Sequence, residues 1–270
     1  MEFRTIVYIE KPGFQIEPCE SILLVGSCFA DSIGQRFQKE KFKAVVNPFG
    51  VMYNPASILH TVERIEEIPR IVFLTLGTNH VYRLKETGEI VDNCEKRPQK
   101  LFQEEELTVD ECVDYLRKAV ELLISRNPEV QIVLTVSPIR YQKYGFHGSQ
   151  LSKATLLLAV SQLTTHLSPL TSHLSYFPAY EIVNDELRDY RFYAADMLHP
   201  SVQTVDYIWE RLSEHYFSEA TKQFLKEWQP IRQALEHKPF HPDSEEYKAF
   251  MDKTMLKVEE LKKKYCTFAL

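Results

Sequence analysis

The sequence is short of glycine and cysteine, and it lacks the patterns that several common functions require. Only eight glycines occur in 270 residues; Gly26 and Gly34 are too widely spaced for a phosphate-binding loop, and no Gly-Lys-Ser/Thr motif is present. The five cysteines form no Cys-x-x-Cys pair, which argues against a zinc knuckle. We therefore expect reduced thiols rather than a disulfide framework, no metal and no cofactor. The cysteines are Cys19, Cys28, Cys94, Cys112 and Cys266.

The chain also lacks an excess of positive charge and long apolar runs. A formal net charge of −6 gives no basic surface for nucleic acid. No apolar run is long enough to span a bilayer, and Met1–Thr5 has no signal-peptide layout. These features predict a cytoplasmic protein with no membrane span and no nucleic-acid partner, and they leave the oligomeric state open. The apolar content of 44% is enough for one large core.

Five short apolar runs alternate with segments of helical periodicity. The runs are continuous, which is typical of parallel strands buried on both faces. We predict a three-layer α/β/α domain with a mostly parallel five-stranded sheet over residues 1–217, and a C-terminal helical extension over residues 218–270. The expected strands are Ile22–Val25, Ala44–Val46, Ile71–Leu76, Gln131–Val136 and His173–Phe177; the expected helices are 31–41, 56–64, 109–126, 152–166 and 202–217.

Three other segments have weaker patterns. Residues Ile6–Ile9 read as an edge strand in an extended lead-in. Residues 81–107 are polar and irregular, with a small hairpin expected at Thr87-Gly88. Residues 141–150 read as a mobile segment, in which His147 lies on an exposed loop or lid.

The stretch from Ile22 to Gly34 organises the expected site. An apolar strand stops at Gly26, and Ser27 and Cys28 follow where a helix is about to begin. Open α/β folds place their chemistry at the carboxyl ends of strands. The N–H groups and positive dipole of a helix N-terminus favour a thiolate or an oxyanion. A βα turn without chemistry is the alternative reading of this stretch alone.

Polar groups that follow the other predicted strands complete a set for acyl transfer. Gly50 and Asn79 offer N–H donors, and Asp196 and His199 offer an acid that orients a base. An activated nucleophile, a base, an orienting acid and oxyanion donors are what acyl transfer needs. Arg140 either binds a substrate carboxylate or phosphate or joins a structural ion pair.

The segment Gly26-Ser27-Cys28-Phe29-Ala30 resembles the signature of the GSCFA family, which belongs to the SGNH (GDSL-like) hydrolase superfamily. The resemblance covers roughly residues 20–215 and implies an SGNH-hydrolase or flavodoxin-like fold. The further matching motifs are Asn47-Pro48-Phe49-Gly50, Tyr53-Asn54-Pro55, Leu76-Gly77-Thr78, Val136-Ser137-Pro138-Ile139-Arg140, Ser152-Lys153 and Asp196-Met197-Leu198-His199-Pro200.

The resemblance implies a role for each site residue. Cys28 falls on the nucleophile position, which is normally Ser, and a one-residue shift would place Ser27 there instead; we favour Cys28. Gly50 and Asn79 fall on the oxyanion donors of the second and third blocks. Asp196 and His199 fall on the last block, Asp-x-x-His. A second departure is His80, which stands where the superfamily usually has Asp.

The combined reading is a hydrolase of ester bonds, an esterase or deacylase that forms an acyl-enzyme on Cys28 or Ser27. The implied substrate is a small-molecule or glycan ester. An acyltransferase with the same mechanism and a non-catalytic binding protein that retains the fold are the alternatives. A nucleotide-binding domain is disfavoured by the glycine spacing.

Overall fold

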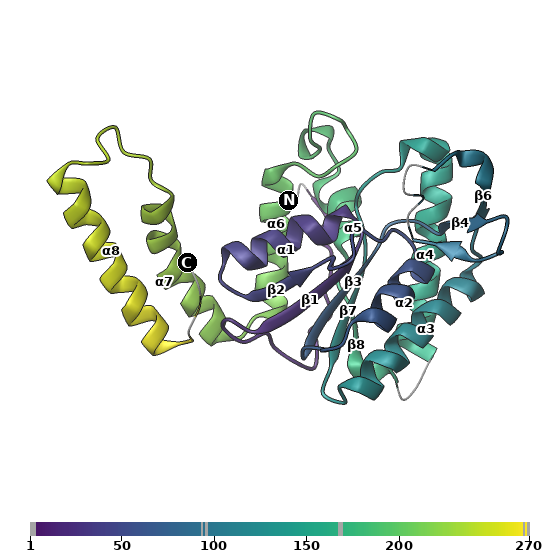
Figure 1. Cartoon of the computed structure of the whole chain (residues 1–270), viewed down its shortest axis with the longest axis horizontal. Helices are drawn as coiled ribbons and strands as arrows, with labels where there is room; N and C mark the ends of the chain where they lie inside the picture. Colours follow the sequence, from purple (N-terminus) through teal and green to yellow (C-terminus); the bar gives the residue numbers. More distant parts are fainter. Residues whose placement is uncertain (1–3, 93, 95–96, 167–169, 267, 269–270) are drawn as a thin grey trace.

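The computed structural model describes residues 4–92, 94, 97–166, 170–266 and 268, and its centre is a five-stranded sheet in which all neighbouring strands are parallel (Figure 1). The strand order is β2-β1-β3-β7-β8. All six residues of β3 are buried, as expected for a strand covered on both faces. The strands are β1 (Ser21–Gly26), β2 (Lys43–Val46), β3 (Ile71–Leu76), β7 (Gln131–Val136) and β8 (Leu174–Tyr176).

Helices cover both faces of this sheet and form two separate apolar cores. One core joins the sheet to α2 (Pro55–Arg64), α3 (Val109–Arg126) and α4 (Gly145–His166). The other joins it to α1 (Cys28–Lys39) and α6 (Val202–Tyr216). The predicted three-layer α/β/α architecture is therefore confirmed. The short α5 (Ala179–Glu181) and a π-helical turn (Ile182–Leu187) follow β8.

The structure corrects the sequence prediction in four segments. Residues Ile6–Ile9 form no strand, and α1 begins at Cys28 rather than at residue 31 because Ser27 caps it. The segment expected to be mobile contains the start of α4, which begins at Gly145. Residues 81–107 contribute to a second, antiparallel sheet, of which only the hairpin at Thr87-Gly88 was expected. Its strands are β4 (His80–Leu84), β5 (Ile90–Val91) and β6 (Phe102–Glu106).

The C-terminal helices α7 (Glu219–Glu236) and α8 (Glu245–Lys264) form a hairpin at one side of the main sheet (Figure 1). The buried indole of Trp228 donates to the carbonyl of Lys39 at 3.2 Å, and Arg232 pairs with the buried Glu40, so α7 packs against the end of α1. The expected boundary at residue 217 remains a prediction. Within the ranges given above, no helix is both long and apolar enough to cross a membrane.

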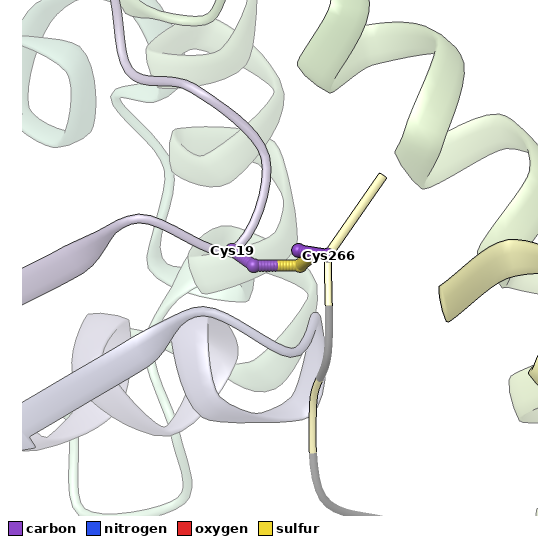
Figure 2. The surroundings of a disulfide bond; sticks show 2 residues. All are labelled: Cys19 and Cys266. Atoms are coloured by element: carbon purple, nitrogen blue, oxygen red, sulfur yellow. A yellow bond between two sulfur atoms is a disulfide. The ribbon is translucent and has the colours of Figure 1, made fainter. Parts of the chain in front are cut away.

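A disulfide joins Cys19, just before β1, to Cys266, just after α8 (Figure 2). The expectation that all thiols are reduced is therefore wrong for these two residues. They are 247 residues apart, and cysteine spacing alone could not reveal that the helical hairpin returns to the start of β1. Cys28, Cys94 and Cys112 are free thiols.

Candidate active site

The turn between β1 and α1 requires glycine at position 26. Gly26 has a φ of +140°, and a Cβ atom there would lie 2.0 Å from the carbonyl oxygen of Thr75. Ser27 is 1% exposed, its hydroxyl accepts from the Phe29 N–H, and it also lies 3.2 Å from the hydroxyl of Thr75. Ser27 is thus the N-cap of α1, and its side chain faces the sheet.

Cys28 is the first residue of α1 and is partly exposed. Its Sγ lies 3.5 Å from the hydroxyl of Tyr53. Partial burial and then the hydrogen bond with Cys28 raise the pKa of Tyr53, so this hydroxyl remains a proton donor at neutral pH. The Cys28 thiol therefore lies at a helix N-terminus and within hydrogen-bond distance of a phenol hydroxyl.

Asp196 and His199 form a hydrogen-bonded pair on one exposed loop. Asp196 Oδ2 lies 2.6 Å from His199 Nδ1, and Oδ1 accepts from the N–H groups of Leu198 and His199 at 2.8 and 3.0 Å. The backbone bonds from His199 and Leu198, followed by the bond to the imidazole, lower the pKa of Asp196 to about 2. This carboxylate fixes the ring and leaves Nε2 as the nitrogen free for chemistry.

Arg140 holds the Asp196–His199 loop in place. Its guanidinium donates to the carbonyl of Met197 at 3.0 Å, and its backbone N–H donates to the carbonyl of Leu198 at 3.1 Å. No carboxylate pairs with Arg140 in the described part of the chain, which disfavours the ion-pair reading. Its guanidinium lies instead over three aromatic rings, those of Phe146, Tyr190 and Tyr193, at 4.0, 5.8 and 5.5 Å.

A cavity of about 220 Å³ adjoins this arginine. Polar side chains dominate its wall, and Arg140 and Arg188 are the cations among them. Arg188 lies 3.5 Å from Asp185, so it has a weak carboxylate partner of its own. The other lining residues are Gln150, Val183, Asn184, Asp189, Tyr190 and Tyr193.

Two tyrosines lie between Cys28 and the segment that contacts the His199 loop. Tyr141 follows Arg140, and its ring packs edge-on against that of Tyr53 with 5.9 Å between centroids. The carboxyl ends of β1, β3 and β7 share one edge of the sheet, so Cys28 and the Arg140–Tyr141 loop lie on the same rim. Among the hydrogen bonds of the described residues, none joins Cys28 to His199.

The two expected oxyanion donors have other partners. The N–H of Gly50 donates to the carbonyl of Asn47 at 2.9 Å and closes a turn. Asn79 is buried, and its Nδ2 donates to the carbonyl of Leu107 at 2.7 Å. His80, the departure from the superfamily pattern, stacks on Tyr144 at 3.5 Å, and desolvation lowers its pKa.

Tyr141 and Lys153 were not predicted as site residues from the sequence. Lys153 is 2% exposed and its Nζ donates to the carbonyl of Gly77 at 2.5 Å. Helical periodicity could have revealed its burial, because it falls in register with apolar positions of α4. The buried positions in that register are Ser149, Ser152, Lys153, Leu156, Ala159, Val160 and Leu163.

Solved structures resemble this fold at low sequence identity. A protein from Lactobacillus plantarum is 11% identical with a TM-score of 0.51, over 76% of this chain and 100% of that one. A carbohydrate esterase family 3 protein from Talaromyces cellulolyticus is 13% identical with a TM-score of 0.41, over 77% and 98% of the two chains. A GDSL-like lipase from Bacteroides thetaiotaomicron is 13% identical with a TM-score of 0.46, over 76% and 88%. No curated protein matches the sequence.

Family models match most of the chain. The model described as the GSCFA family matches residues 21–71 and 67–212. A second model, described as the GSCFA domain protein C-terminal domain, matches residues 228–270 and so includes α8. These matches confirm the resemblance drawn from the Gly26–Ala30 motif. The chain therefore belongs to the GSCFA family.

Proposed function

We propose that this protein hydrolyses carboxylic esters or thioesters through an acyl-enzyme on Cys28. The observation that supports this most directly is the Asp196–His199 pair, whose geometry orients an imidazole as a base on the rim where Cys28 begins α1. Ser27 is a poor alternative nucleophile because its hydroxyl is buried and serves as the helix cap.

The reaction has two balanced steps. In the first, His199 Nε2 takes the proton of the Cys28 thiol, the sulfur attacks the ester carbonyl carbon, and the proton passes to the leaving alcohol as its C–O bond breaks. In the second, His199 takes a proton from water, the hydroxide attacks the thioester carbon, and the carboxylic acid leaves as the C–S bond breaks and the proton returns to the Cys28 sulfur. Both steps require the imidazole to come within hydrogen-bond reach of the sulfur, and such contacts tighten on substrate binding.

The developing oxyanion needs donors on the same rim. The N–H of Cys28, at the first position of α1, is the proposed donor. The N–H groups of Phe29 and Ala30 already donate to the hydroxyl and the carbonyl of Ser27. Gly50 and Asn79 remain candidates by family resemblance. For either to donate, the bond from Gly50 to Asn47 or that from Asn79 to Leu107 would have to be shared or opened.

Arg140 is proposed to bind an anionic group of the substrate. Its guanidinium has no carboxylate partner among the residues described, lies over aromatic rings and lines the 220 Å³ cavity beside the His199 loop. Arginine forks match carboxylate and phosphate geometry. Asp189 in the same wall would oppose a highly charged ligand, which favours a single carboxylate on a small-molecule or glycan ester.

Turnover of a matched set of esters tests the proposal. Acetyl, butyryl and succinyl esters of one chromogenic alcohol, together with an acetylated sugar, would be compared across variants. His199→Ala and Cys28→Ala should abolish turnover, while His241→Ala, an exposed histidine in the α7–α8 turn, serves as the control. Turnover that survives His199→Ala would refute the mechanism. Products formed on added alcohols would indicate acyl transfer instead of hydrolysis.

A further inference from the structure

A lysine buried near the site has no carboxylate partner. Lys153 on α4 is 2% exposed, and no ion pair involving it is found among the described residues. Its Nζ donates to the carbonyl of Gly77 and lies 5.6 Å from the ring centroid of Tyr141. Burial lowers the pKa of Lys153 to about 7. A buried unpaired ammonium is costly, so its position next to a candidate site suggests a function.

The neighbouring Ser152 contacts the same turn. Its hydroxyl lies 2.9 Å from the hydroxyl of Thr78 and accepts from the N–H of Asn79 at 3.0 Å. Together with the bond from Lys153 to the carbonyl of Gly77, two successive residues of α4 therefore hold three successive residues after β3. We call this pair, Ser152 and Lys153, the α4 clamp.

The turn that the α4 clamp contacts also binds the backbone of Tyr53. The N–H groups of Gly77 and Thr78 both donate to the carbonyl of Tyr53, at 2.9 and 2.8 Å. A side chain at Gly77 would be crowded, since a Cβ there would lie 3.0 Å from this carbonyl and 3.2 Å from the side chains of Ser27 and Tyr141. The series of contacts ends at the Tyr53 hydroxyl, 3.5 Å from Cys28 Sγ.

We propose that Lys153 is a positioning residue that, through Gly77, holds the Tyr53 hydroxyl against the Cys28 sulfur. It does not act as the base, because no described hydrogen bond connects its Nζ to Cys28. The inference rests on the proposed function only in taking Cys28 as the nucleophile. It predicts that the reactivity of the Cys28 thiol depends on Lys153 and on Tyr53 as one unit.

A double-mutant cycle on the full chain tests this. The rate of Cys28 alkylation by iodoacetamide at pH 7 is read from peptide masses in the wild type, Lys153→Met, Tyr53→Phe and the double variant. Each single change should slow alkylation by about three-fold, because the sulfur loses its hydrogen bond with the positioned Tyr53 hydroxyl. The double variant should be no slower than the slower single variant. The free thiol of Cys94 is the internal reference, and Lys118→Met, a surface lysine on α3, is the control.

Two results would overturn the proposal: the single effects multiplying to about nine-fold in the double variant, or unchanged alkylation in a folded Lys153→Met protein. If circular dichroism shows that Lys153→Met does not fold, Ser152→Ala replaces it in the cycle with the same expectation of non-additivity. Iodoacetamide reports on the thiol itself. A failure of ester turnover would therefore count against the proposed function, whereas the alkylation rates test the role of Lys153.

Discussion

Nδ1 of His199 and Oδ2 of Asp196 lie 2.6 Å apart on a loop in which the same carboxylate also accepts the backbone N–H groups of Leu198 and His199. Only two residues separate Asp196 from His199, and the carboxylate is held by backbone bonds as well as by the imidazole. Met197, between them, has a φ of +59°, and its carbonyl is bound by Arg140. The orientation of the imidazole is therefore fixed before any substrate binds.

Asp196→Asn should reduce kcat by about 10²–10⁴-fold with a smaller change in KM. The amide can donate to Nδ1, which would put the ring in the wrong tautomer while the loop keeps its shape. Steady-state kinetics on an activated ester measures this, with Asp110→Asn, an exposed aspartate at the start of α3, as the matched variant. Equal loss in both variants, or none in Asp196→Asn, would contradict the assigned role.

The pKa of Asp196 also predicts a pH dependence. Because its folded pKa of about 2 lies below the usual aspartate value, the stabilisation from ionised Asp196 is complete above about pH 4 and is lost as pH falls towards 2. The wild type should therefore be more stable than Asp196→Asn at pH 4, and this difference in the free energy of unfolding should shrink as the pH falls to 2. Denaturant unfolding across this range is the measurement. A constant difference would show that the bonds to Leu198 and His199 do not stabilise the ionised form.

Ser27→Ala should affect stability more than chemistry. Loss of the N-cap hydroxyl costs about 1 kcal/mol, and the hydroxyl of Thr75 loses a neighbour as well. Ester turnover and Cys28 alkylation should stay within about three-fold of the wild type. A three-fold change in rate corresponds to less than about 1 kcal/mol of activation free energy. Urea unfolding and kinetics on the same preparation separate the two effects. Turnover abolished in a folded Ser27→Ala protein would instead identify Ser27 as the nucleophile.

The lowered pKa of Lys153 predicts that the free energy of unfolding rises with pH above about 7. The unfolded chain binds its proton up to the usual lysine pKa near 10.4, but the folded chain releases it near 7, so the unfolded state holds more protons between these values. The free energy of unfolding of the wild type should gain about 2 kcal/mol over Lys153→Met from pH 7 to pH 9. The raised pKa of His60 makes stability fall as pH rises, but this contribution is the same in both proteins. It therefore cancels when the free energy of unfolding of Lys153→Met is subtracted from that of the wild type. A flat difference would mean that Lys153 is not desolvated.

The disulfide predicts a redox-dependent melting temperature. Cys19–Cys266 closes a loop over nearly the whole chain, and removal of such a cross-link typically costs about 2–5 kcal/mol. Cys266→Ser and reduced wild type should both melt at lower temperature than oxidised wild type, while Cys94→Ser should not. Scanning calorimetry with and without reductant measures this. Identical melting in both conditions would show that α7 and α8 are held by packing around Trp228 alone.

The alternation of apolar runs and helical segments was enough to predict the main sheet, because β1, β3 and β7 are buried on both faces and read as continuous apolar stretches. The second sheet was not predictable in this way. Its edge strand Phe102–Glu106 has one apolar residue and four polar ones, so its pairing with β4 depends on long-range contacts rather than on local pattern.

The residues of the candidate site could be predicted where a sequence motif follows the end of a strand. Asp196 and His199 are three residues apart, and the hydrogen bond between them is as expected. The choice between Ser27 and Cys28 depended on where α1 starts, and sequence placed that start three residues too late. The partners of Gly50, Asn79 and Lys153 lie on segments distant in sequence or in turns of unusual backbone, which no local rule specifies.

Trapping the acyl-enzyme tests the central claim most directly. The full chain would be mixed with an activated acetyl ester, quenched in acid within the first turnover and digested for peptide mass analysis. We expect an acetyl group on Cys28 that hydroxylamine removes at neutral pH, as is typical of a thioester, and no such group in His199→Ala. Acetylation of Ser27, or steady turnover with no adduct on Cys28 and no dependence on His199, would contradict it.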